Sequence, residues 1–207
     1  MSGCGTPIKI EKFSEKTLQE YAELVASAEG KPFVGSVSAL VSALAASLGS
    51  LAVSLAGGEA EARVKTAAEE LRQIRAYMLG TVDDDIKARA PLKRRKQKPE
   101  DKAALEGAAR VACGIPSDIV FVMCRNIELL DQIADVVDAQ GAVCVITAVH
   151  LSLAVIYSMQ AEVRALSKYM TDEIFARTVI RETEMHLEQH QPMADALLEK
   201  MQKKMME

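Results

Sequence analysis

The sequence contains no tryptophan, and aromatic residues account for only 4% of its 207 positions. A hydrophobic core must therefore come from the Ala, Leu, Val, Ile and Met that supply most of its 49% hydrophobic fraction. These residue types pack helices closely together. The composition favours an all-α fold and argues against an all-β fold.

The usual signatures of enzyme chemistry are also absent. The sequence has no phosphate-binding or dinucleotide-binding Gly loop, no His-Glu-x-x-His motif, no Ser nucleophile elbow and no Cys-x-x-Cys pair. His186 and His190 have a spacing that can bind a metal ion, but they stand among charged residues on a helix face that we expect to be exposed. We therefore predict no metal site.

Targeting and charge signals are weak. The four cysteines lack metal-ligand spacing, and no basic segment followed by an apolar core begins the chain, so we expect a cytoplasmic protein. The net charge is −4, and the single basic run, 93–98, is followed at once by Glu100 and Asp101. We expect no nucleic-acid partner. The basic run fits a solvated loop, with a contact to a phosphate or a polyanionic ligand tail as the alternative.

One segment, 36–56, has the length of a membrane span and carries no charge. It is rich in Ser, Ala and Gly, and these small residues recur at four-residue spacing, which lets neighbouring helix backbones approach closely. The other helical segments are amphipathic. We therefore expect a helix buried at the centre of a bundle and no membrane partner.

The pattern along the chain predicts one helical domain, 1–207, with a core at about 14–190, a charged loop at 91–99 and a Met- and Lys-rich tail at 193–207. The fold class is an all-α, single-domain bundle of long antiparallel helices around the small-residue helix. Two helices are apolar on nearly all sides, so we expect a homodimer to cover part of them. The expected helices span 14–27 with Ser14 as N-cap, 36–56, 59–90, 100–113, 117–139, 143–169 and 171 onward, with a break at Gly114 and Pro116, a turn at Gly141 and a bend at Pro192.

Three features of the sequence are candidates for chemistry. Pro32, Gly35 and Ser36 lead into the small-residue helix, where free N–H groups and the helix dipole attract an anion; an ordinary helix cap is the alternative. Asp84 and Asp85 belong to a run of three acidic residues whose pKa values rise if one is buried; a solvated helix end is the alternative. His150, alone in an apolar run, fits a hydrogen-bonded core residue or a ligand contact.

The order of these features resembles the family of formiminotetrahydrofolate cyclodeaminases and methenyltetrahydrofolate cyclohydrolases. The resemblance runs from about residue 14 to 190. The features that carry it are Pro32 with Gly35-Ser36 before the small-residue helix, then Asp84 or Asp85, then 102–116, and a late helical pair.

The resemblance implies a homodimer with a folate-binding cleft near the subunit interface. Asp84 or Asp85 would be the catalytic acid or base, and Pro32, Gly35, Ser36, Lys102 and His150 would bind the ligand. The family reaction closes a one-carbon ring by expelling ammonia from a formimino group, or opens a methenyl ring with water to give 10-formyltetrahydrofolate. A tetrahydrofolate derivative would be the substrate, with no tightly bound cofactor.

The chain departs from the family pattern at three places. The Asn residues that the family carries farther along have no counterpart, since Asn126 is the only Asn and lies elsewhere. Phe33-Val34 stand where the family has loop glycines, and the family's Ser-Asp pair falls at Val143-Cys144 or Thr147-Ala148. The alternative is therefore a non-catalytic relative that binds another small molecule or a protein partner. The Met-rich tail would then be a candidate docking helix.

Overall fold

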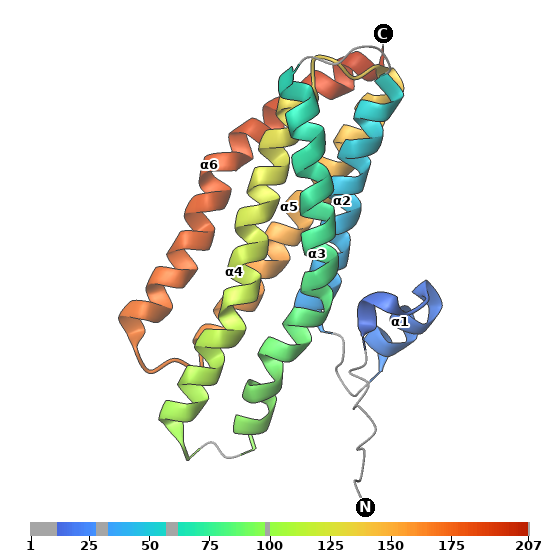
Figure 1. Ribbon diagram of the computed structural model, residues 1–207. Helices are drawn as coiled ribbons and strands as arrows, with labels where there is room; N and C mark the ends of the chain where they lie inside the picture. The colour runs from blue at the N-terminus through green and yellow to red at the C-terminus, as the bar shows by residue number, and fades with distance from the viewer. Residues whose placement is uncertain (1–11, 28–32, 57–61, 98–99, 207) are drawn as a thin grey trace, which may run out of the picture.

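The computed structural model describes residues 12–27, 33–56, 62–97 and 100–206. Within these ranges the chain forms one short 3₁₀ turn and six α-helices and no strand, which confirms the all-α prediction. Five long helices stand side by side and alternate in direction, and the short α1 lies beside the beginning of α2 (Figure 1). The elements are η1 (Phe13–Glu15), α1 (Leu18–Ala26), α2 (Val34–Ala56), α3 (Ala62–Arg95), α4 (Lys102–Ile133), α5 (Ala139–Ser167) and α6 (Glu173–Met205).

The small-residue helix is α2, and it packs against α3, α4 and α5. Its close approach depends on residues without bulk: a Cβ on Gly49 would stand 2.9 Å from a methyl group of Leu130 and 3.0 Å from one of Leu71. Within a single chain, α2 is not covered on all sides. Leu44 and Leu51 remain 52% and 46% exposed, because no described helix of the same chain covers that side of α2.

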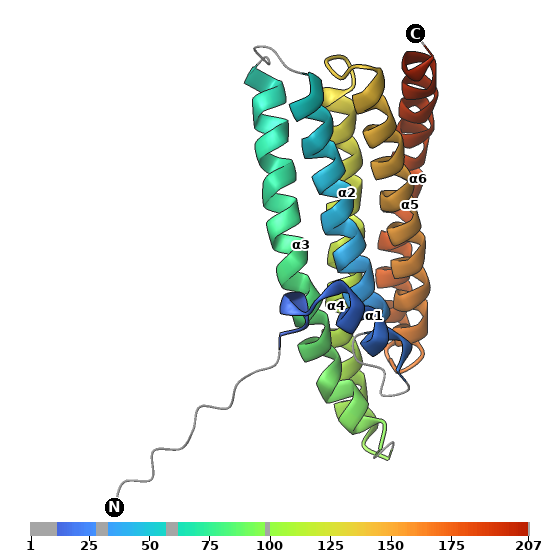
Figure 2. The same ribbon diagram turned by 90° about the vertical axis from the view of Figure 1, so that its right-hand side faces the viewer.

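Helix length was underestimated at the three prolines that the structure describes. Pro91, Pro116 and Pro192 all lie inside helices, so the predicted break near Gly114 is wrong, and the segment 91–99 is helical as far as Arg95. The predicted tail is the last part of α6, where Ala194, Leu197 and Met201 are buried. Packing along a long helix outweighs the loss of one backbone hydrogen bond at each proline. The bend that remains is visible at the end of α3 (Figure 2).

Three predicted helix boundaries also need correction. Thr17, with a full capping box, begins α1 in place of Ser14. Asp172 accepts the first N–H groups of α6 in place of Thr171. Gly141 lies inside the first turn of α5 and does not form a turn between helices.

Three helices, α2, α4 and α5, have the length and composition of membrane spans, with mean hydropathies of 1.9, 1.4 and 2.0. In their most apolar windows, 39% of the residues in α2 and 50% in α4 and in α5 are buried inside the bundle. Packing between helices therefore accounts for only part of this apolar character. The rest lies on the outer sides of the helices.

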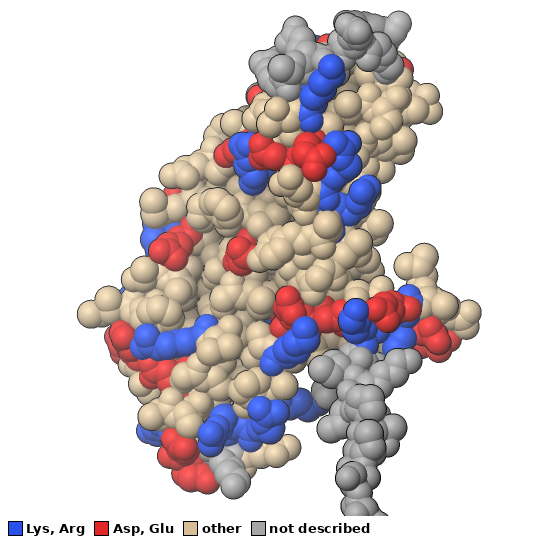
Figure 3. Space-filling model, in the orientation of Figure 1, with Lys and Arg blue, Asp and Glu red and all other residues tan. Residues whose placement is uncertain are grey.

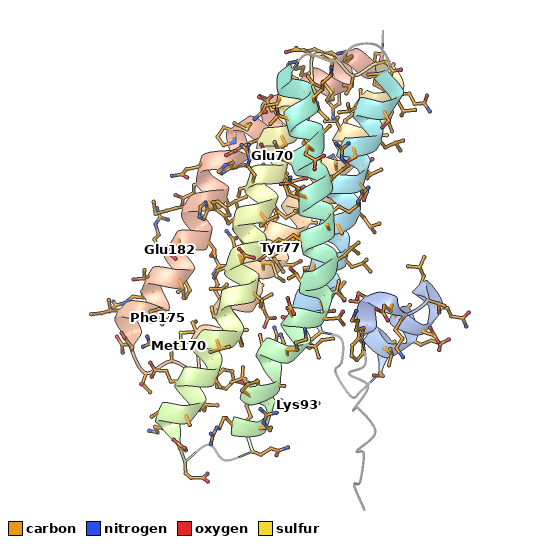
Figure 4. The ribbon with its side chains drawn as sticks, viewed as in Figure 1. Glu70, Tyr77, Lys93, Met170, Phe175 and Glu182 are labelled. Atoms are coloured by element: carbon orange, nitrogen blue, oxygen red, sulfur yellow. The ribbon has the colours of Figure 1, made fainter. Side chains whose placement is uncertain are left out.

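A small second core closes the lower end of the bundle, where α3 ends and α5 turns into α6. Figure 4 shows Lys93 at the end of α3, and Met170 and Phe175 at the α5–α6 turn. The buried members of this core are Leu92, Ala108, Ala109, Ala112, Cys113, Val163, Leu166 and Met170. This core supports the side chains that line the cavity described below.

A buried carboxylate fixes the beginning of α2 to α3. The Ser36 N–H donates to Oδ2 of Asp85 over 3.0 Å, and the Asp85 side chain is fully buried. A Cβ on Gly35 would stand 2.2 Å from Oδ1 of Asp85, so only glycine leaves room for this carboxylate. Glycine at position 35 is therefore required by packing against α3.

Replacement of Gly35 by alanine tests this contact. We expect Gly35→Ala to lower the free energy of unfolding by about 1–3 kcal/mol, the usual cost of overpacking, because the Asp85 carboxylate must move. Gly107→Ala is the matched control, since a Cβ there meets nothing within 4 Å. It should raise stability by about 0.5–1 kcal/mol through helix propensity. Urea denaturation followed by circular dichroism measures both, and equal effects would contradict the packing argument.

Candidate functional site

A cavity of about 390 Å³ lies at the lower end of the bundle between the beginning of α2, the end of α3 and the end of α5. Its volume is within the usual range of small-molecule sites. Lys and Arg side chains gather at this end of the molecule (Figure 3). The lining residues are Phe33, Arg89, Leu92, Lys93, Lys96, Glu162, Ala165, Leu166 and Tyr169.

A row of three charged side chains runs from the interior to this cavity. The Arg89 guanidinium donates from Nε to Oδ1 of Asp85 over 3.1 Å, and its other side forms an ion pair with Glu162 of α5. Asp85 is fully buried, whereas the Arg89 and Glu162 side chains are 18% and 8% exposed and both border the cavity. Two carboxylates therefore share one guanidinium in a poorly solvated place.

Burial raises the pKa of the Asp85 carboxyl, and the nearby Glu162 carboxylate adds to this rise. The Arg89 charge and the Ser36 N–H oppose it. A carboxyl group with a raised pKa holds a proton more readily than one in water. The row as a whole therefore has the composition of an acid–base system next to a cavity.

The N-terminus of α2 already holds an anion, and that anion is Asp85. The Ser36 N–H, one of the first free donors of the helix, is bonded to its carboxylate. The Ser36 hydroxyl is 2.9 Å from the hydroxyl of buried Tyr21 on α1. The predicted attraction of an anion to this helix end is therefore satisfied within the chain.

Aromatic rings and cations alternate along the cavity wall. The Arg89 guanidinium lies 4.7 Å from the centre of the Phe33 ring, and the Lys96 ammonium lies 4.3 Å from the centre of the Tyr169 ring. Phe33 is 44% exposed, so it forms a wall of the cavity and leaves the space open. The arrangement suits a flat ring that stacks on an aromatic side chain and carries negative charge at one end.

Of the residues predicted for a site, the structure brings Gly35, Ser36 and Asp85 together. Asp84 points elsewhere: it is exposed, pairs with Lys87 over 2.7 Å and borders a different hollow, on the side of η1. Successive residues of a helix project about 100° apart, so adjacent carboxylates face different surroundings.

The remaining predicted residues lie apart from the cavity. Lys102 is exposed at the first position of α4, and His150 is exposed on α5, so the interpretation of His150 as a core residue is wrong. Neither lines the cavity. Pro32 lies outside the described residues.

Sequence reasoning missed Arg89, Glu162 and Tyr169. Arg89 stands four residues after Asp85. Because residues at this spacing lie on one face of a helix, the sequence could have indicated this ion pair. Glu162 comes from α5, 73 residues away in sequence, and nothing local indicates that pairing. Lys96 belongs to the basic run for which a polyanionic ligand tail was the alternative.

Comparison with known proteins agrees with this fold. A family model described as formiminotransferase-cyclodeaminase matches residues 17–185. The crystal structure of a formiminotetrahydrofolate cyclodeaminase from Thermotoga maritima superimposes with a TM-score of 0.77 at 19% sequence identity, over 92% of this chain and 96% of that one. A comparison with curated proteins found no match. At this identity the superposition shows a shared fold, and the family model covers most of the chain. The chain therefore belongs to the formiminotransferase-cyclodeaminase family.

Proposed function

We propose that the cavity binds a tetrahydrofolate derivative and that the chain interconverts its one-carbon group, from formimino or methenyl to formyl. The observation that carries this proposal is the row Asp85–Arg89–Glu162, which ends at a cavity with aromatic walls and basic residues. Family membership supports the same class of substrate.

A reduced folate matches the cavity in two respects. Its aromatic parts suit Phe33 and Tyr169. Its glutamate tail is anionic, and Lys93 and Lys96 line the same cavity.

The sequence-based hypothesis gave the acid–base role to Asp84 or Asp85, but a different carboxylate faces the cavity. Both reactions move a proton at the one-carbon group, which requires a positioned acid or base. Glu162 borders the cavity, whereas Asp85 does not. We therefore assign the proton transfer to Glu162, and Asp85 acts through Arg89 as a positioning residue.

Replacement of Glu162 by glutamine tests this role. We expect Glu162→Gln to slow hydrolysis of 5,10-methenyltetrahydrofolate, followed by its ultraviolet absorbance, by about 10²–10⁴-fold, since general acid–base catalysis contributes this much. Glu70→Gln is the matched control: Glu70 also pairs with an arginine, Arg125, but stands on α3 at the other end of the bundle from Lys93 (Figure 4). Tetrahydrofolate binding without turnover by the unmodified chain would favour the non-catalytic relative. If the unmodified chain shows neither binding nor turnover, that result contradicts the folate proposal.

The basic wall predicts a preference for long glutamate tails. We expect Lys96→Ala to weaken binding of a polyglutamylated tetrahydrofolate about 1.4- to fivefold, as for an exposed ion pair of about 0.2–1 kcal/mol, and to change binding of the monoglutamate less. Lys87→Ala removes a lysine outside this cavity and should change neither. Fluorescence titration at two salt concentrations measures the effect. Equal losses for both ligands would argue against a tail site here.

We also propose that a second copy of the chain covers the outer side of α2 and α5. No described helix lies over this face above α1 (Figure 2). Among the incompletely buried residues of each helix, one row recurs at alternating intervals of four and three, the spacing of a helix–helix seam. On α2 this row is Val37, Val41, Leu44, Leu48, Leu51 and Leu55; on α5 it is Val143, Thr147, His150, Ala154 and Tyr157.

Introduction of charge into this face tests the homodimer. We expect Leu44→Glu combined with Leu51→Glu to convert a dimer into a monomer in sedimentation equilibrium, because two carboxylates would be buried without partners. Val111→Glu, at a residue of α4 that is 60% exposed, should leave the mass unchanged. A wild-type chain that is monomeric, or that leaves membranes only in detergent, would contradict the proposal.

A cytoplasmic location completes this proposal. The described cysteines Cys113, Cys124 and Cys144 are free thiols, as expected in a reducing compartment. Reduced folates are themselves protected from oxidation under such conditions.

A further inference from the structure

A second group of reactive side chains lies far from the cavity, where α4 crosses α6. It consists of Cys124 on α4 and the pair His186 and His190 on α6. One ligand atom from each of these three residues lies within 4.8 Å of the other two. Because the histidines are separated by one helical turn, they present both rings to the same side of α6.

The structure corrects the prediction that this histidine pair is exposed. Both rings are partly buried, and the His190 side chain is only 13% exposed. The Cys124 thiol and Nδ1 of His190 contact the same oxygen, the carbonyl of His186, at 3.7 Å and 2.7 Å. The thiol and this ring nitrogen therefore lie on one side of the group.

His190 has the surroundings of a metal-binding histidine. Its Nε2 is 2.9 Å from Oε1 of Glu128, and Arg125 donates to the other oxygen of that carboxylate over 2.6 Å. A carboxylate that accepts the N–H of one ring nitrogen orients the ring and leaves the other nitrogen to coordinate a metal ion. Phe121 contacts the His186 ring edge-on and limits its freedom.

We propose that Cys124, His186 and His190 bind a zinc ion that ties α6 to α4. A thiolate with two imidazoles is a donor set that zinc prefers, and three protein ligands leave a fourth tetrahedral position for water. Calcium and magnesium prefer oxygen ligands and do not fit this set. On binding, the Cys124 thiol loses its proton to solvent, and His190 also releases to solvent the Nδ1 proton that it donates to the His186 carbonyl, so that Nδ1 coordinates the metal.

A metal ion at this position would link α6 to α4 where α6 has few buried residues. Only four residues of α6 are buried: Thr183, Ala194, Leu197 and Met201. A metal ion between α4 and α6 would add a strong link in the stretch between Thr183 and Ala194. Both histidines lie beyond residue 185, where the family model ends, whereas Cys124 lies within the matched segment. None of the three lines the cavity proposed for the folate reaction.

Cobalt substitution tests the proposal with the full chain, untagged, reduced and stripped of metal with a chelator. We expect one Co²⁺ per chain, the visible bands of a tetrahedral ion and a near-ultraviolet thiolate-to-cobalt band, all lost when Zn²⁺ is added. The charge-transfer band identifies a cysteine ligand without any substitution. Zn²⁺ should also raise the midpoint of thermal unfolding, since it binds the folded chain.

Variants assign the ligands. Cys124→Ser should remove the charge-transfer band and His190→Gln should weaken Co²⁺ binding at least tenfold, whereas Cys144→Ser and Cys113→Ser should retain both the band and the affinity. Circular dichroism of each variant establishes that it is folded. Absence of the band in the wild-type chain, its persistence in Cys124→Ser, or its loss in Cys144→Ser would each overturn the proposed ligand set.

Discussion

The buried carboxylate of Asp85 is the constraint on which the lower half of the bundle depends. Burial of a charge costs several kcal/mol unless hydrogen bonds and an opposite charge compensate for it. Here the Ser36 N–H and the Arg89 guanidinium supply that compensation, and Gly35 supplies the space. Because Arg89 also pairs with Glu162, one carboxylate sets the positions of α2, α3 and α5 relative to one another.

Much of the fold was predictable because it follows from composition and periodicity. The all-α class and the small-residue helix depend on local patterns, which the sequence displays directly. Helix ends at prolines were not predictable in this way. Pro116 is buried within α4, and the surrounding Ile119, Val120 and Met123 are fully buried, so packing maintains the helix across the proline. Tertiary packing of this kind has no signature in the local sequence.

The site was predictable only in part, for a related reason. The acidic run indicated the correct turn of α3, but its three adjacent carboxylates lie in three different environments. Asp83 accepts hydrogen bonds from Phe13 and Ser14, Asp84 pairs with Lys87 at the surface, and Asp85 is buried. Their rotation about α3 relative to α2 decides which one is buried. That rotation is a property of helix packing, which depends on residues far away in the sequence.

The occupied N-terminus of α2 also explains how a chain with Phe33 in place of a loop glycine keeps a ligand-sized cavity. Since Asp85 takes the Ser36 N–H, that donor is not open to an external anion. Under the proposed function, negative charge on a ligand is recognised by side chains at the end of α3 and just after it, where Lys93 and Lys96 line the cavity. Phe33 meanwhile offers Arg89 a ring face and holds the guanidinium between two carboxylates. Under the proposed function, Phe33 in place of the glycine shifts the binding of a ligand from backbone to side chains, while the contacts Asp85–Arg89 and Arg89–Glu162 are retained.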